Sequence, residues 1–216
     1  MKMDGFVDSL SPADRSRVLE AMSSMQFAKN QVVFHQGDLG QTLHIVNRGH
    51  FIVHSISRSG DRTALVVLGP GDVFGEMAVL SAESTRTATV TAIDSASSLA
   101  LDRTTVDELR RTSINIDRLL LDILTSTVQR LTTRQMELTA LTAPERVIRR
   151  VGELLDAYPG GKIRLHQGEI AALCNTTRAT VNATLGELKA EGLMVQEGRA
   201  IVVLQPDEVR KRAKAL

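Results

Sequence analysis

The sequence predicts an α+β protein: a jelly-roll-like antiparallel β-roll in the N-terminal half, then one long helix, then a small C-terminal unit of helices closed by a hairpin. Between residues 27 and 102, apolar and polar residues alternate with the period of a strand, in short runs separated by Gly-rich turns. Residues 114–138 contain neither Gly nor Pro and repeat their leucines at helical spacing. Two short helical segments, 167–174 and 177–190, precede an apolar hairpin at 193–204.

The strand-like runs are flanked by two helical segments. Residues 9–25 place apolar residues at helical spacing, with Ser11 as the expected N-cap and Pro12 at the first helical position. The strands that follow are short and closely spaced, which is typical of a compact antiparallel roll. After the last strand, Thr104 or Thr105 is expected to cap a short helix.

The long helix carries an apolar stripe that predicts a parallel coiled-coil dimer. Leucines recur every seven residues, at Leu124, Leu131 and Leu138. Leu120 and Thr127 occupy the intervening positions, and Arg134 interrupts the stripe. A helix of this length exceeds what one small roll needs to cover itself, so a second copy of the chain is the expected partner. The alternative is that the stripe packs against the chain's own sheet.

Composition bounds the class of protein. The net charge is +1, but residues 139–216 carry 12 Lys/Arg against 9 Asp/Glu, whereas residues 1–138 carry 14 against 16. The C-terminal part is therefore the more basic one, as expected of a module that faces nucleic acid. A single cysteine cannot form an internal disulfide or a four-cysteine metal site. With no apolar leader and no membrane-spanning run in the sequence, we expect a cytoplasmic protein that contacts no membrane.

The C-terminal helices have the pattern of a winged helix-turn-helix. Asn175 lies at the turn between them, where a left-handed backbone is needed, and Thr177 is the expected N-cap of the second helix. That helix turns its N-terminal side chains outward, toward a DNA major groove, at Thr177, Arg178, Ala179, Asn182 and Ala183. The hairpin is the expected wing, from which Arg199 would contact a phosphate. The alternative is a small packing unit without DNA contacts.

Residues 69–91 contain the most informative pattern in the roll. Gly75-Glu76 opens a short apolar turn, and Arg86-Thr87 follows ten residues after Glu76. A guanidinium fork with backbone N–H groups suits a phosphate, and a carboxylate can accept a hydrogen bond from a sugar hydroxyl. A ribose with a cyclic phosphate would satisfy all of these groups. The alternative is a plain Glu76–Arg86 salt bridge.

These motifs resemble the Crp/Fnr family of bacterial transcription regulators, and particularly its cyclic-AMP receptor protein branch. In the family's order and spacing, the chain carries FHQGD at 34–38, LGPGDVFGEMAVL at 68–80, TRTATV at 85–90 and RLHQGEIAALCNTTRATVNATL at 164–185. The resemblance covers nearly the whole chain. It implies a sensor that binds cyclic AMP or a related cyclic mononucleotide without a metal, a dimer helix, and a winged helix-turn-helix.

The resemblance also assigns residues to the nucleotide. Gly75, Glu76 and Met77, with Arg86 and Thr87, match the family's phosphate-binding cassette. By this resemblance Glu76 would bind the ribose 2′-OH, while Arg86, Thr87 and the backbone of Gly75 and of the next residue, Ala88, would hold the cyclic phosphate.

The sequence departs from the family pattern at residues that contact the nucleotide base and at residues that read the DNA operator. Thr132 and Thr133 fall near the family's adenine-contacting hydroxyls, but Leu131 stands where the cyclic-AMP branch has a hydroxyl residue. In the recognition helix, Ala179 and Ala183 replace the family's usual Glu and second Arg. A cytosine-reading carboxylate and a guanine-reading guanidinium are lost, so we expect a palindromic site with altered half-sites or more shape readout.

Other branches of the family fit less well. Iron–sulfur members need several cysteines, and haem-binding members need an axial ligand. The histidines of the roll, His35, His44, His50 and His54, lie in strand-like settings that are more often structural. Cys174 resembles an apolar core residue, with redox regulation as the lesser alternative.

The sequence therefore predicts three parts: a sensor roll at 1–110, a dimerisation helix at 111–139 and a DNA-binding domain at 140–216. The expected partners are palindromic double-stranded DNA, a second copy of the chain and RNA polymerase. No catalytic triad, metal cluster or P-loop is present in the sequence, so we do not expect an enzyme. Two rivals remain: a cyclic-nucleotide module that controls a protein partner, and a DNA binder whose pocket has lost its ligand.

Overall fold

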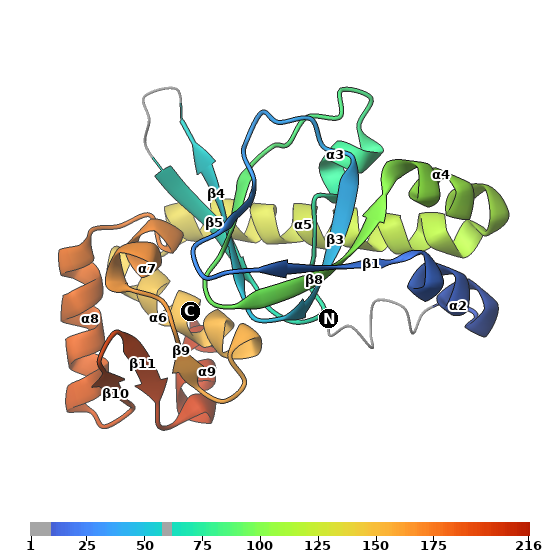
Figure 1. The fold of residues 1–216 in the computed structure, drawn as a ribbon. Coiled ribbons are helices and arrows are strands. Elements are labelled where there is room, and N and C mark those ends of the chain that lie inside the picture. The colour runs from blue at the N-terminus through green and yellow to red at the C-terminus, as the bar shows by residue number, and fades with distance from the viewer. Residues whose placement is uncertain (1–9, 58–61) are drawn as a thin grey trace. The chain divides into compact units, whose positions relative to one another are not determined.

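Two four-stranded sheets with antiparallel pairing form the roll of the N-terminal half (Figure 1). The first sheet has the spatial order β1 (Ser23–Phe27), β8 (Ala96–Asp102), β3 (Thr42–Arg48), β6 (Val73–Phe74). The second has the order β2 (Val32–Phe34), β7 (Thr89–Ala92), β4 (Phe51–Ile56), β5 (Arg62–Leu68). A short helix, α3 (Glu76–Leu80), follows β6. The predicted α+β architecture with its antiparallel roll is confirmed.

The computed structural model describes residues 10–57 and 62–216. Internal contacts divide the chain into two units, each of which is considered by itself. The first comprises Met1–Ser55 and Leu68–Leu131, and the second comprises Ile56–Val67 and Thr132–Leu216. The predicted domain limits at residues 110 and 139 stay a prediction. Within the described part of the chain, no helix combines the length and the apolar content needed to cross a bilayer.

Two helix boundaries differ from the sequence prediction. The N-terminal helix α2 (Pro12–Ala21) begins as expected, since the Ser11 hydroxyl accepts from the Asp14 N–H at 3.1 Å. It ends before residue 25, because Ser23–Phe27 pairs with β8 as a strand. In α4 (Arg103–Thr112) the predicted threonine cap is wrong. Asp102 is the N-cap, and its carboxylate accepts from the Thr105 N–H at 2.9 Å.

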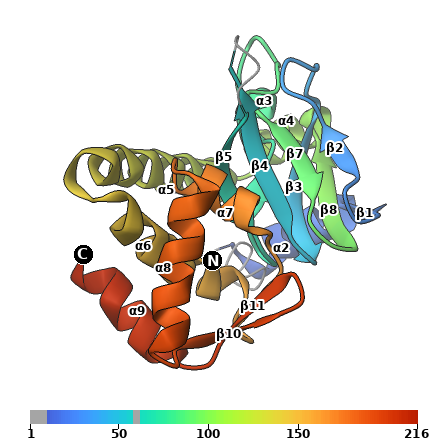
Figure 2. The same ribbon diagram turned by 90° about the vertical axis from the view of Figure 1, so that its left-hand side faces the viewer.

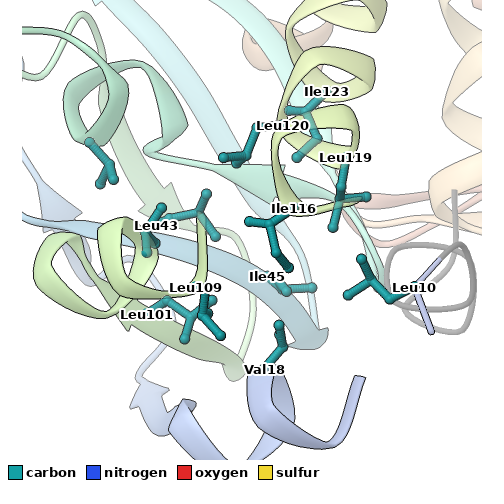
Figure 3. Close-up of a cluster of buried hydrophobic side chains, with 12 residues drawn as sticks. Leu10, Val18, Leu43, Ile45, Leu101, Leu109, Ile116, Leu119, Leu120 and Ile123 are labelled. Atoms are coloured by element: carbon teal, nitrogen blue, oxygen red, sulfur yellow. The ribbon is translucent and has the colours of Figure 1, made fainter. Parts of the chain in front are cut away.

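The long helix α5 (Ile114–Ala140) buries one face in the core of the first unit (Figure 3). The side chains that α5 contributes to this cluster are Ile116, Leu119, Leu120 and Ile123. They meet Leu43 and Ile45 of β3 and Val18 of α2. Leu120 was expected in the dimer stripe, and that placement is wrong because its side chain is buried.

A second apolar face of α5 stays exposed. Leu121, Val128 and Leu131 are 60%, 61% and 51% exposed, and Leu138 is exposed as well. Together with half-buried Leu124, they follow the alternating three- and four-residue spacing of a coiled-coil seam. Leu121 and Val128 therefore occupy the positions that the sequence pattern gave to Leu120 and Thr127.

The C-terminal part contains the expected helix-turn-helix and hairpin (Figure 2). Its elements are α6 (Ala143–Ala157), β9 (Lys162–Ile163), α7 (Gln167–Leu173), α8 (Arg178–Ala190), β10 (Met194–Glu197), β11 (Ala200–Val203) and α9 (Pro206–Ala215). Asn175 has φ 47°, so the predicted left-handed turn residue is confirmed. The hairpin strands β10 and β11 pair with each other, and β9 adds a third strand beside β11.

Helices α6 and α9 pack closely at Gly152. A Cβ atom at this position would overlap the Cβ of Ala213 on α9. By contrast, a Cβ at Gly186, inside α8, would meet no described atom within 4 Å. The same substitution should therefore have opposite effects at these two helical glycines.

Gly152→Ala is expected to destabilise the protein by about 1–3 kcal/mol, because the added methyl group forces α6 and α9 apart. Gly186→Ala is its matched control and should stabilise by up to about 1 kcal/mol, since alanine is the better helix former. Urea unfolding followed by circular dichroism measures both free energies. A Gly152→Ala variant at least as stable as the wild type would show that Gly152 is not needed for this close packing.

Candidate functional site

Arg86 is the centre of the predicted cassette, and its guanidinium is buried in the roll with 5% exposure. Nη1 donates to the carbonyl oxygens of Thr42 at 2.8 Å and of Gly75 at 3.1 Å. Nη2 donates to the Thr42 hydroxyl at 2.8 Å. The guanidinium carbon lies 3.9 Å from the ring centroid of Phe34, which adds a cation–π contact. The buried charge is therefore held by backbone, hydroxyl and aromatic groups.

One edge of this guanidinium remains available. Arg86 has five N–H donors, and three of them make the bonds to Thr42 and Gly75. Its Nε is buried and has no hydrogen-bond partner among the described residues. The Nε–H and the remaining N–H of Nη2 lie on one edge of the fork, which is the pair that binds a phosphate or carboxylate in two parallel bonds. An oxyanion at this edge would satisfy the orphaned donor.

Two glycines lie so close to Arg86 that neither position could carry a side chain without a clash. Gly75 has φ 82°, and a Cβ there would lie 2.6 Å from Arg86 Nη1. A Cβ at Gly40 would lie 2.6 Å from Arg86 Nε, on the side of the unpartnered donor. Any larger residue at either position would fill the cradle or displace the guanidinium. The orphaned Nε and the glycine cradle together fit a phosphate group.

Glu76 is buried next to this cradle, with 8% exposure. Burial raises the pKa of its carboxyl above the usual range, although its own backbone N–H and the cations Arg130 and Arg86 act in the opposite direction. The structure describes both Glu76 and Arg86, and no ion pair within 4.0 Å joins them. The salt-bridge alternative is therefore wrong, and the carboxylate is free to accept from a ligand hydroxyl.

The other predicted nucleotide residues are arranged unequally. Thr87 and Met77 are exposed next to each other, with the Thr87 hydroxyl 3.6 Å from the Met77 sulfur, while Ala88 is buried. Thr132 and Thr133 are exposed on the part of α5 that belongs to the second unit, whereas the cassette belongs to the first. Their contact with a base stays a prediction.

Sequence reasoning missed three residues that shape the cassette: Phe34, Gly40 and Thr42. They come from β2, from the turn after it and from β3, more than 40 positions before Arg86. Gly40 and Thr42 have no periodic or motif signal of their own. FHQGD did match the family pattern, but nothing in a sequence shows that the Phe34 ring lies against Arg86.

The exposed face of α8 has the predicted composition. Arg178, Ala179, Asn182 and Ala183 are all exposed. The Thr177 hydroxyl accepts from the Thr180 N–H at 3.1 Å, so the predicted N-cap is confirmed. Val181, Leu185 and Leu188 are buried on the opposite side, as expected. Arg199 is exposed in the hairpin, between β10 and β11.

Within the second unit, the end of α5 is tied to the helix-turn-helix by arginines of α6. Buried Glu137 of α5 pairs with Arg149 and Arg150 of α6, each at 2.8 Å. Arg146 donates to the Leu141 carbonyl at 2.9 Å. At the turn before α8, it donates to the carbonyls of Cys174 at 2.9 Å and of Asn175 at 3.1 Å. A shift of α5 at this point would therefore disturb groups that hold the turn before α8.

Comparison with known proteins identifies both halves of the chain. Residues 24–113 match the family model for the cyclic nucleotide-binding domain, and residues 145–212 match that for the Crp-like helix-turn-helix domain. The cyclic AMP receptor protein of Thermus thermophilus is 31% identical over 219 residues, which covers 100% of this chain and 96% of that protein. The chain belongs to the Crp/Fnr family. It is accordingly a cyclic-nucleotide-binding, DNA-binding transcription regulator.

Two solved structures of the same fold differ in how they are described. FixK2 from Bradyrhizobium japonicum superposes with a TM-score of 0.76 at 20% identity, covering 90% of this chain and 96% of that one. The c-di-GMP responsive regulator CLP from Xanthomonas campestris has a TM-score of 0.71 at 23% identity, covering 89% and 99%. These likenesses establish the fold, and they leave the choice of nucleotide open.

His44 and Cys174, two residues that other sensors of this family could use, are both buried here. The His44 ring is buried and hydrogen-bonded on both sides, to Thr42 and Ser98. Cys174 is buried, and burial raises the pKa of its thiol to about 12 despite the nearby arginines Arg150, Arg134 and Arg146. A thiol with so little thiolate reacts slowly with oxidants. In residues 10–57 and 62–216, no group of three or more His, Cys, Asp or Glu side chains is placed to hold a metal ion.

Glu76→Gln is expected to stabilise the ligand-free protein at neutral pH. Because the folded pKa of Glu76 is raised, its contribution to stability is fully present below the unfolded pKa and is lost as the pH rises through the folded pKa. The stability advantage of the variant should therefore be larger at about pH 7 than at about pH 4. Urea unfolding at both pH values, with the exposed Glu83→Gln as control, measures this difference. An advantage that does not grow with pH would contradict it.

Proposed function

We propose that this protein is a homodimeric transcription regulator whose roll binds cyclic AMP, or a related cyclic mononucleotide, and whose affinity for a palindromic operator depends on that ligand. The observation that carries the proposal is the unpartnered Nε donor of buried Arg86, beside Gly40, where a Cβ atom would lie 2.6 Å from Nε. The likeness to a cyclic AMP receptor protein supports cyclic AMP as the first ligand to test. Because its partner is chromosomal DNA, the proposal places the protein in the cytoplasm.

Each cassette residue has a role in the proposal. Arg86 binds the cyclic phosphate through Nε and Nη2, with Thr87 and the backbone of Gly75 and Ala88 as further donors. Glu76 accepts from the ribose 2′-OH, and Met77 lies beside the Thr87 hydroxyl at the exposed rim of the cassette. Thr132 and Thr133 of α5 contact the base.

The exposed seam of α5 is the proposed dimer interface. Leu121, Val128 and Leu131 are apolar and more than half exposed, at spacings that place them on one side of a supercoiled helix. A second copy of α5 would bury this face. Pairing two chains would also present two recognition helices about 34 Å apart, as a palindromic operator requires.

Ligand control would act through α5. A nucleotide that contacts the cassette and the α5 threonines favours one position of that helix. The Glu137 and Arg146 contacts then pass this position to the turn before α8. The free-energy difference between the two helix positions is what the ligand changes. RNA polymerase would be the partner of the DNA-bound dimer.

Isothermal titration with cyclic AMP, cyclic GMP and c-di-GMP tests the sensor. We expect the wild type to release or absorb heat on binding a cyclic mononucleotide. Arg86→Leu should bind at least about a hundredfold more weakly, because two charge-assisted hydrogen bonds are lost. Arg48→Leu, an exposed arginine of β3, should bind as the wild type does. A response only to c-di-GMP would reassign the ligand. No binding of any of the three would leave a ligand-independent DNA binder.

Arg178→Ala and Arg199→Ala separate base reading from phosphate contact. Loss of a bidentate base contact at Arg178 should weaken operator binding by about tenfold to a hundredfold and leave non-specific DNA nearly unchanged. Loss of Arg199 should weaken both DNAs alike and lower the salt dependence by about one counterion. Fluorescence anisotropy over a range of salt concentrations measures both. If wild-type protein shows no salt-dependent affinity for DNA, control of a protein partner becomes the better explanation.

A further inference from the structure

The residue that holds Arg86 most closely is Thr42, and Thr42 is itself held by a histidine. The Thr42 hydroxyl accepts from Arg86 Nη2 at 2.8 Å and lies 2.9 Å from His44 Nε2. On the other side of the ring, His44 Nδ1 lies 3.0 Å from the Ser98 hydroxyl. A buried chain of hydrogen bonds therefore leads from the guanidinium through β3 to β8.

The direction of this chain follows from counting hydrogens. A threonine hydroxyl has one hydrogen to donate. Since the Thr42 oxygen already accepts from the Arg86 cation, its own hydrogen is satisfied only by the His44 Nε2 lone pair. His44 then carries its proton on Nδ1 and donates to Ser98. With the opposite tautomer, the Thr42 hydroxyl hydrogen would have no acceptor among the described residues.

The surroundings keep the His44 ring neutral and fixed. Its side chain is 2% exposed and stacks on Phe74, with 4.8 Å between ring centroids and 5° between ring planes. Burial, with a smaller effect from the Arg86 cation, lowers the pKa of His44 to about 4. The ring is therefore an acceptor at neutral pH, whereas a protonated ring would have no lone pair for Thr42.

We propose that His44 is a positioning residue for the nucleotide phosphate: by accepting from Thr42, it turns the hydroxyl lone pair toward Arg86 Nη2 and leaves the Nε edge directed at the ligand. Without this acceptor, the Thr42 hydroxyl is free to turn its hydrogen toward the guanidinium, which repels it. This inference rests on the proposed function, because it assumes that Arg86 binds the phosphate.

Two substitutions at His44 separate the acceptor from the packing. His44→Phe keeps an aromatic ring against Phe74 but removes the Nε2 acceptor. His44→Gln loses the stacked ring but can place a carbonyl oxygen near the position of Nε2. Thr42→Val has a similar shape to threonine, lacks the hydroxyl, and keeps the backbone carbonyl that binds Nη1. Circular dichroism and thermal melts first establish that each variant folds.

Titration of each variant with cyclic AMP gives the test. We expect His44→Phe to bind about fivefold more weakly than the wild type, which is the size of one net hydrogen bond, and His44→Gln to bind within about twofold of it. Thr42→Val should also bind more weakly. The double variant, Thr42→Val with His44→Phe, should bind no more weakly than Thr42→Val alone, because Thr42→Val already breaks the chain of hydrogen bonds.

The outcomes distinguish this inference from the proposed function. If the wild type binds cyclic AMP but His44→Phe binds equally well, or His44→Gln is as weak as His44→Phe, His44 has only a packing role and the inference is overturned. Additive losses in the double variant overturn it too. Where His44→Phe is poorly stable, Thr42→Val and His44→Gln still carry the comparison. Failure of the wild type to bind cyclic AMP, cyclic GMP and c-di-GMP overturns both.

Discussion

The burial of one cation, the Arg86 guanidinium, is the constraint on which the sensor depends. A buried charge is costly unless its donors are satisfied, and here three of them go to Thr42 and Gly75 while the face of the group rests on Phe34. The Nε donor has no hydrogen-bond partner among the described residues, and an anionic ligand, as proposed, would satisfy it. Gly75 and Gly40 lack side chains for the same reason, because a Cβ atom would lie 2.6 Å from Nη1 at Gly75 and 2.6 Å from Nε at Gly40.

The long helix α5 reconciles two demands on one element. Its inner face supplies core residues such as Leu119 and Ile123, which fix the helix to the roll through apolar burial. Its outer apolar face remains available for a second chain. At its C-terminal end, buried Glu137 pairs with buried Arg150 and half-buried Arg149, and removing one partner of a buried ion pair is strongly destabilising. The helix is therefore held by apolar burial near its beginning and by ion pairs near its end.

The helix-turn-helix keeps the fold of its family but lacks two side chains that the family's recognition helix usually carries. Thr177 caps α8, and Asn175 provides the left-handed turn before it, so the helix is presented as in a DNA-binding unit. Ala179 and Ala183 leave only methyl groups where base-reading side chains would stand. Under the proposal, sequence preference would come from Arg178, from Asn182 and from the shape of the DNA. The buried face of α8 packs in the core, and the opposite face carries the proposed DNA contacts.

The sequence by itself determined the order of elements and the place of the helix-turn-helix, because strand period, helix caps and turn residues are local signals. The cassette residues were named only through the resemblance of their motif to the family, and their contact with a nucleotide stays a prediction. The sequence failed where neighbouring residues compete for one role, and where the outcome depends on contacts between distant segments. Asp102 rather than a threonine caps α4, since a carboxylate accepts from the Thr105 N–H and the neighbouring hydroxyls together. The heptad pattern could not tell Leu120 from Leu121, because both fit an apolar stripe and only packing against the roll decides which is buried. In the same way, only the tertiary structure brings Gly40, Thr42 and Phe34 to Arg86, because three-dimensional proximity leaves no periodic trace in a chain.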